Sequence, residues 1–261
     1  MKSKLLLFLI INISINISLS AKEEQIPLKS KNGISIGMQA YKYRYEEEVD
    51  GSTFMSTEGA KYGLVADGTI VFGKKGFLNT EARYSKGYVK YKGSETGDVS
   101  EDMFEIRLAV GSEEEIGNYL LGFYSGLGYR VLKNNLQELG DGGYQRKSYY
   151  TYLPIGAFHR FHLGDSGRLS TKLEYDFLLE GEQKSNLSDI NPAYSDVTNE
   201  QNSGYGLKLS TAYEEKNWSF GLFFNYWEIE DSEEVEFYPN AYAMEPKNHT
   251  LEYGVDMRIR F

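Results

Sequence analysis

The sequence contains no cysteine, only three histidines, and no apolar run of about 20 residues that could form a membrane-spanning helix. Without cysteine, the chain has neither a disulfide framework nor the lipid-modified cysteine of a lipoprotein. What it has in abundance is tyrosine, with 22 residues, and aromatic residues make up 15% of the chain. Tyrosine suits β-strands and water–lipid interfaces, because its apolar ring carries a polar tip.

The first 21 residues have the layout of a secretory signal peptide. Lys2 and Lys4 precede an apolar run that starts at Leu5, and small residues lie at Ser20 and Ala21. A permanent membrane anchor fits less well, because Asn and Ser alternate with Ile in the second half of the run. We therefore expect a signal peptide at 1–21, export across the inner membrane, a short periplasmic segment at 22–32 and one domain at 33–261.

The formal net charge is −10 at pH 7, and it becomes more negative once the two lysines of the signal peptide are removed. An acidic chain repels the phosphate backbone, so we expect no nucleic-acid partner.

Apolar residues alternate with polar or small ones along most of the chain, as in the final stretch LEYGVDMRIRF. This period of two predicts β-strands with two unlike faces. In the first strand the apolar phase changes between Met38 and Tyr41, which suggests a bulge or a mixed face, and Pro154 suggests a bulge or interruption in the sixth. The ten predicted strands cover 33–45, 60–72, 77–91, 103–111, 119–130, 149–161, 168–180, 204–213, 218–226 and 251–261.

The connections between these strands are alternately long and short, as in transmembrane barrels with short periplasmic turns and long outer loops. Predicted strands of about 9–13 residues fit a tilted crossing of a bilayer better than a soluble sandwich does. The fold class is therefore all-β: a transmembrane antiparallel up-and-down β-barrel, most simply of ten strands, with eight or twelve as alternatives. An even strand count places both ends on the periplasmic side.

The alternating segments and the terminal strand resemble small bacterial outer-membrane β-barrel proteins of the porin-like and outer-membrane-protein-A-like group. The stretches GYRVLKNN, YLPIGAFHRF and LEYDFLLEG also resemble exported barrel proteins, and this resemblance implies no activity. The resemblance implies a location in the bacterial outer membrane, with its lipid and lipopolysaccharide and the outer-membrane assembly machinery as partners. It also implies that the last strand is the assembly signal, through Tyr253, Val255, Met257, Ile259 and Phe261.

If the apolar face points outward, the lumen is charged. Acidic and basic side chains would pair there, because an unpaired buried charge is costly. Two interpretations remain open: a salt-bridged plug that makes the barrel rigid, or a narrow pore with charged walls. Inward glycines such as Gly128 would either make room for long Arg and Tyr side chains or leave a gap for water. The predicted lumen charge network consists of Glu81, Arg83, Glu105, Arg107, Lys172, Glu174, Asp176, Asp256 and Arg258.

No motif assigns an enzymatic activity. The acidic stretches at 46–51 and 231–236 lack the spacing of a calcium loop, so we expect no metal and no cofactor. The function that we expect is non-catalytic: membrane integrity, adhesion or a small-solute porin. The alternative is an outer-membrane hydrolase, a protease or a lipid A-modifying enzyme, with a site at the outer rim near His249, because a histidine beside a carboxylate can act as a base. Oligomeric state and ligand are left open.

Overall fold

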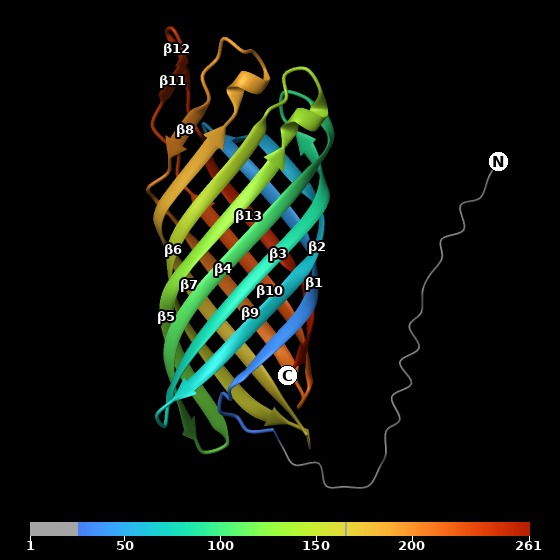
Figure 1. The fold of residues 1–261 in the computed structure, drawn as a ribbon, viewed down its shortest axis with the longest axis vertical. Helices are drawn as coiled ribbons and strands as arrows, with labels where there is room; N and C mark the ends of the chain where they lie inside the picture. Colours follow the sequence, from blue (N-terminus) through green and yellow to red (C-terminus); the bar gives the residue numbers. More distant parts are fainter. Residues whose placement is uncertain (1–25, 165) are drawn as a thin grey trace, which may run out of the picture.

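The computed structural model describes residues 26–164 and 166–261, so the predicted signal peptide lies outside the described residues. The chain forms a closed barrel of ten antiparallel strands (Figure 1). Each strand pairs with its neighbour in the barrel, and β6 pairs with β7 to close the cylinder. This confirms the predicted fold class. The barrel strands are β1 (Gly33–Val49), β2 (Ser52–Phe72), β3 (Gly76–Lys92), β4 (Thr96–Ile116), β5 (Tyr119–Asn135), β6 (Gln145–Leu163), β7 (Gly167–Ser185), β9 (Gly204–Glu214), β10 (Trp218–Ile229) and β13 (Lys247–Arg260).

The two ends of the barrel differ. At one end, here called the turn end, short turns join the strands and Phe261 ends the chain beside β1. Gly73 and Gly117 occupy these turns with positive φ angles of 60° and 63°, a conformation that glycine adopts without strain. The other end, the loop end, carries the 3₁₀ helices η1 (Leu136–Leu139) and η2 (Leu187–Asp189), the short β8 (Val197–Glu200), and the hairpin of β11 (Val235–Tyr238) and β12 (Ala241–Ala243). The hairpin rises above the barrel at the top of Figure 1.

A band of apolar side chains covers the outside of the barrel. On β1, Ile36 and Met38 are 52% and 70% exposed, whereas Tyr41 and Tyr43 point inward and are buried. The register of β1 with β2 is unbroken from Gly33 to Glu47, so of the two alternatives predicted near Met38 the bulge is wrong and the mixed face is correct. The apolar phase changes because the interior itself becomes apolar toward the loop end. The register shift in this strand lies later, between Glu47 and Glu48.

The strands near the loop end are longer than predicted. β2 and β4 each contain 21 residues, and the acidic stretches predicted as long loops at 46–59 and 92–102 mostly extend these strands. A two-residue turn, Asp50 and Gly51, joins β1 to β2 with positive φ angles at both positions, the geometry of a tight hairpin. Apart from Phe54, which is 63% exposed, these extensions have polar outer faces, so the apolar alternation that marks the membrane part of a strand ends before the strand does.

Pro154 lies inside β6, which continues past it. The ladder between β5 and β6 has paired positions at Ser125 with Ile155 and at Gly128 with Tyr152, and the two positions between them are unpaired. The Ser125 hydroxyl donates to the Pro154 carbonyl at 2.9 Å. A proline without an N–H group therefore interrupts the ladder locally and leaves the register unchanged, while a bulge against β7 lies at Thr151 and Tyr152.

Candidate functional site: the closed lumen and its two ends

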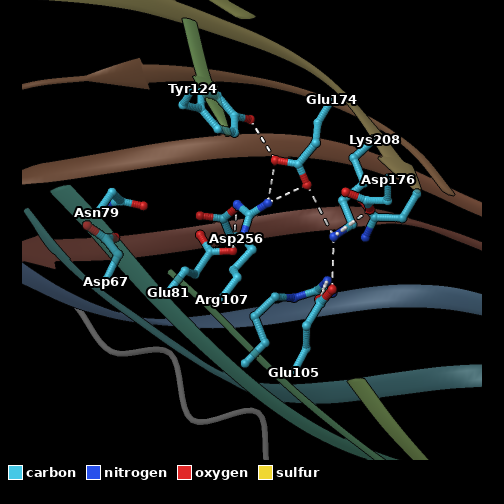
Figure 2. A network of polar contacts seen from close by, with 12 residues as sticks. Asp67, Asn79, Glu81, Glu105, Arg107, Tyr124, Glu174, Asp176, Lys208 and Asp256 are labelled. Carbon is cyan, nitrogen blue, oxygen red and sulfur yellow. Dashed lines mark hydrogen bonds and ion pairs between the residues drawn. The ribbon is translucent and has the colours of Figure 1, made fainter. Parts of the chain in front are cut away.

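The centre of the lumen holds a network of opposite charges. Arg107 on β4 contacts Glu81 on β3 at 3.1 Å and Glu174 on β7 at 2.5 Å. Lys208 on β9 then connects Glu174, at 3.3 Å, to Glu105, at 2.9 Å. Figure 2 shows these side chains pointing toward one another from different strands.

The network continues toward both ends of the barrel. Toward the turn end, Arg258 on β13 contacts Asp67 and Asp256 at 2.8 Å each, and Glu81 at 3.1 Å. Toward the loop end, Glu105 contacts Arg83 at 2.9 Å, and Arg83 contacts Glu252 at 3.3 Å, which in turn contacts Arg130 at 2.7 Å. Acids and bases thus alternate without a break along the chain of contacts Asp67, Arg258, Glu81, Arg107, Glu174, Lys208, Glu105, Arg83, Glu252 and Arg130.

Eight of the nine residues of the predicted network form ion pairs in the lumen. Asp176 joins through Lys208, at 3.0 Å. Lys172 faces the same space and is the exception, because it has no hydrogen bond or ion pair with the residues that the structure describes. The predicted network omits Arg130, Lys208 and Glu252, although the alternation of the sequence places all three on the inward faces of their strands.

A layer of aromatic side chains fills the lumen on the loop side of this network. We call Tyr43, Tyr150, Tyr152 and Trp227 the aromatic layer; each is at most 3% exposed. Tyr152 donates from its hydroxyl to Glu105 at 2.6 Å, and the Trp227 ring lies 5.5 Å from the Arg130 guanidinium. A side chain at Gly128 would overlap the Tyr152 ring, so this inward glycine makes room for an aromatic ring. The charges and the rings therefore close the barrel together.

On the turn side of the network the lumen is open. A cavity of about 390 Å³ extends from Glu105 to the turn between β9 and β10 and to the described N-terminal residues. Its walls carry charges of both signs, and Lys172 lies in its lining. No group of three or more His, Asp or Glu residues in the described ranges is arranged to hold a metal ion.

The N-terminal segment, residues 26–32, lies across the turn end of this cavity. Leu28 is 4% exposed and packs with Phe77, Leu120 and Phe158. Arg168 on β7 donates to the backbone carbonyl of Leu28 at 3.0 Å. Two further contacts hold the segment: the Ser30 N–H and hydroxyl donate to Glu113 at 2.6 and 2.8 Å, and Arg160 donates to the Leu28 carbonyl at 3.1 Å.

At the loop end, two carboxylates share one guanidinium. Arg146 on β6 contacts Glu47 on β1 at 2.6 Å and also contacts Glu245, which precedes β13. The Tyr45 hydroxyl lies 3.0 Å from Glu47 and 3.1 Å from Glu245. Burial raises the pKa of Glu245 to about 8, and the nearby Glu47 carboxylate raises it too, against the opposing effect of Arg146. The backbone of Glu245 also bonds Ser232, so this cluster joins the hairpin segment to the barrel.

His249, the candidate base, lies outside the lumen. It stands on β13 between Glu46 on β1 and Glu228 on β10 in the register. Its Nε2 atom is 2.8 Å from Glu46, and its Nδ1 atom is 3.8 Å from Glu48. In the register, Ser56 on β2 stands opposite Glu46 on β1, and Glu46 stands opposite His249 on β13. Glu46 therefore lies between the serine and the imidazole. This order does not build the nucleophile–base–carboxylate chain that a serine hydrolase needs.

The predicted assembly residues lie together on the outer face of β13. Tyr253, Val255 and Met257 are 52%, 38% and 53% exposed, and Ile259 and Phe261 are 54% and 76% exposed. They continue the apolar band across the seam between β13 and β1, and the Phe261 N–H donates to the Ile34 carbonyl at 2.8 Å.

No protein-family model matches the sequence, and no curated protein matches it. Solved structures with a similar fold include the outer membrane protease OmpT from Escherichia coli, with a TM-score of 0.54, 8% identity, and coverage of 88% of this chain and 97% of that one. The outer membrane protein OprG from Pseudomonas aeruginosa is similar with a TM-score of 0.42, 11% identity, and coverage of 93% and 99%.

At such low identity the likeness concerns the fold alone. Together with the closed ten-stranded cylinder and its outward apolar band, it identifies the chain as a β-barrel of the bacterial outer-membrane type.

Proposed function

We propose that the chain spans the outer membrane as a non-conducting barrel and that its loop end binds a partner at the cell surface. The apolar band has the height that a membrane requires. On β5, outward apolar residues run from Leu121 to Val131, and ten residues at about 3.3 Å each, tilted by about 40°, rise about 25 Å. That height matches the apolar band of transmembrane barrels.

The observation that carries the proposal is the closed loop half of the lumen. A porin needs a continuous aqueous passage. Here the aromatic layer is buried, and its Trp227 ring lies beside Arg130, which pairs with Glu252; these two residues are 2% and 1% exposed. The cavity of about 390 Å³ reaches only the turn end. These contacts favour the salt-bridged plug over the narrow pore.

The loop end has features of a binding surface. Tyr194 packs edge-on against Phe237 and Tyr238 of β11, with ring centroids 5.2 and 5.6 Å apart. Tyr238 and Tyr242 remain 46% and 56% exposed at the hairpin. Exposed tyrosines supply a large contact area at a small entropic cost. The carboxylates around them, among them Glu234 and Glu236, favour a partner with a basic surface.

Conductance of the refolded chain in a planar bilayer tests the closed lumen. We expect no channel openings, although the folded protein is present in the bilayer. Steady openings that change in Arg258→Ala would instead support a small pore.

Attachment of bacteria that produce the chain to cultured epithelial cells tests the binding surface. We expect Tyr238→Ser with Tyr242→Ser to reduce attachment. Phe54→Ser is a matched control, because Phe54 is also exposed, at 63%, on the part of β2 near the loop end. Equal attachment by the double variant and the control would reject the hairpin as the binding surface.

The hydrolase near His249 remains the second candidate, supported by the 2.8 Å contact between His249 and Glu46. It predicts hydrolysis of a peptide or of lipid A by the purified barrel, lost in His249→Ala and retained in Arg258→Ala. The surface-binding proposal predicts no hydrolysis that depends on His249.

A further inference from the structure

A row of three lysines crosses the outer wall of the barrel near the loop end. In the register, Lys133 on β5 stands directly opposite Lys147 on β6, and Lys147 stands directly opposite Lys184 on β7. Their chain neighbours Leu132, Arg146 and Gln183 are buried inside, at 3%, 4% and 1% exposure. Because successive side chains of a strand point to opposite faces, all three lysines face outward. We call these three residues the lysine row.

Such an arrangement is unfavourable without a counter-charge, because like charges directly opposite each other destabilise a pair of strands. Three other cations of the outer wall meet carboxylates: Lys247 lies 2.9 Å from Glu228, and Lys86 lies 3.7 Å from Asp102. Arg44 likewise contacts Glu46. The lysine row differs from these pairs, because its lysines face other lysines in the register.

Only one member of the row has a carboxylate partner. Lys184 lies 3.3 Å from Glu182 on its own strand. Asp102 stands opposite Lys133 in the register, but it is bonded to Lys86 and to the Tyr84 hydroxyl, at 2.8 Å. Within the described part of the chain, neither Lys133 nor Lys147 has a hydrogen bond or an ion pair.

The row lies at the upper edge of the apolar band. On β5, Lys133 is the first outward residue beyond Val131 and Tyr129. On β6, which runs away from the loop end, Lys147 is the outward residue next to Tyr149 on its loop side. Aromatic residues mark the interface of a transmembrane barrel with water, and the charged headgroups of lipids lie just beyond that level. The three ammonium groups therefore stand where the phosphate groups of the outer leaflet would be.

We propose that the lysine row binds the phosphate group of a lipid in the outer leaflet. A phosphate offers several acceptor oxygens and enough negative charge to compensate the facing ammonium groups, while the lipid chains pack on the apolar band below. This goes beyond the proposed surface role, because it assigns a binding site to the wall of the barrel. It also explains why three lysines face one another across adjacent strands.

Thermal unfolding of the chain, refolded in uncharged detergent micelles without its signal peptide, tests this site. Lipid A with its phosphate groups is titrated in, and the rise of the unfolding midpoint gives its affinity. We expect Lys133→Gln/Lys147→Gln/Lys184→Gln to bind it at least about tenfold more weakly than the wild type, since charged hydrogen bonds are lost. Without lipid, the triple variant should unfold at the same temperature as the wild type or higher, because repulsion is relieved.

A matched control removes the same charge elsewhere. Lys42, Lys90 and Lys92 are also exposed on the outer wall, and none of them faces another lysine in the register. Lys42→Gln/Lys90→Gln/Lys92→Gln should retain the affinity of the wild type. Equal affinity of both triple variants, or equal stabilisation of the wild type by dephosphorylated lipid A, would overturn the proposal. Inorganic pyrophosphate that binds as tightly as the lipid would also overturn it, because the site would then serve a soluble anion.

Discussion

Arg130 on β5 and Glu252 on β13 meet at 2.7 Å inside the barrel, although 122 residues separate them in the sequence. Glu252 also accepts from Asn225 at 3.0 Å and contacts Arg83 at 3.3 Å. One carboxylate thus compensates two guanidinium groups in the layer where the lumen closes. Such cross-lumen pairs join strands on opposite sides of this barrel that share no ladder.

The first prediction concerns this carboxylate. Glu252→Gln should lower the free energy of unfolding by about 3–5 kcal/mol, because it leaves the buried Arg130 without its ion-pair partner and leaves Arg83 with Glu105 alone. Urea unfolding in phospholipid vesicles measures the change. Glu114→Gln is the control, since Glu114 pairs with Lys75 and both side chains are about half exposed, at 50% and 56%. An equal, small effect of both substitutions would contradict a structural role of the network.

The second prediction concerns the N-terminal segment. Arg168→Ala should loosen residues 26–32, because the guanidinium donates to the carbonyls of Leu28 and of its neighbours Pro27 and Lys29. Trypsin should then cut the refolded protein faster after Lys29 or Lys31, as N-terminal sequencing of the product would show. Arg260→Ala is the matched control, because Arg260 bonds the same Glu214 without touching the segment. Equal cutting of both variants would mean that Arg168 does not hold the segment.

The fold was predictable from the sequence because lipid imposes one rule on every strand: apolar side chains point outward. The same rule fails where the strands leave the membrane. Tyr41 and Tyr43 reverse the apolar phase of β1 because they fill the lumen, and the sequence alone could not decide between such a mixed face and a bulge. The alternation also predicted which charges face inward. It could not predict their partners, since the contact of Arg83 with Glu252 depends on the closure of the cylinder.

The lysine row shows the same limit. Lys133, Lys147 and Lys184 belong to three separate segments, and only the register brings them side by side. A change of register by one residue would turn each of them to the other face. The sequence shows where the strands lie, but only the structure shows which residues of neighbouring strands face one another.

The third prediction concerns pH. The folded-state pKa of Glu245 is raised to about 8 from an ordinary value of 4.5, so the folded protein holds this proton more tightly than the unfolded chain. The stabilising effect of protonation is therefore complete below about pH 4.5 and is lost as the pH rises through about 8.

Urea unfolding at several pH values tests this prediction. The urea midpoint of the wild type should fall over this interval more than that of Glu245→Gln. Glu234→Gln, at an exposed position of the loop end, should behave as the wild type does. Parallel pH profiles of the wild type and Glu245→Gln would contradict the prediction.

The last prediction concerns the end of the chain. Phe261 has an outward ring that is 76% exposed, and its backbone bonds Ile34 from both the N–H and the carbonyl. Deleting Phe261 removes the ring and the backbone hydrogen bonds together, so it should slow insertion into the outer membrane. The measurement is the rate at which the heat-modifiable folded form appears.

Two substitutions of Phe261 separate the contributions of the ring and the backbone. Phe261→Ala keeps the backbone and removes the ring, and Phe261→Tyr keeps both. If the ring is the signal for assembly, Phe261→Ala should be as slow as the deletion and Phe261→Tyr as fast as the wild type. Rapid insertion of Phe261→Ala would assign the effect to the closure of the seam between β1 and β13.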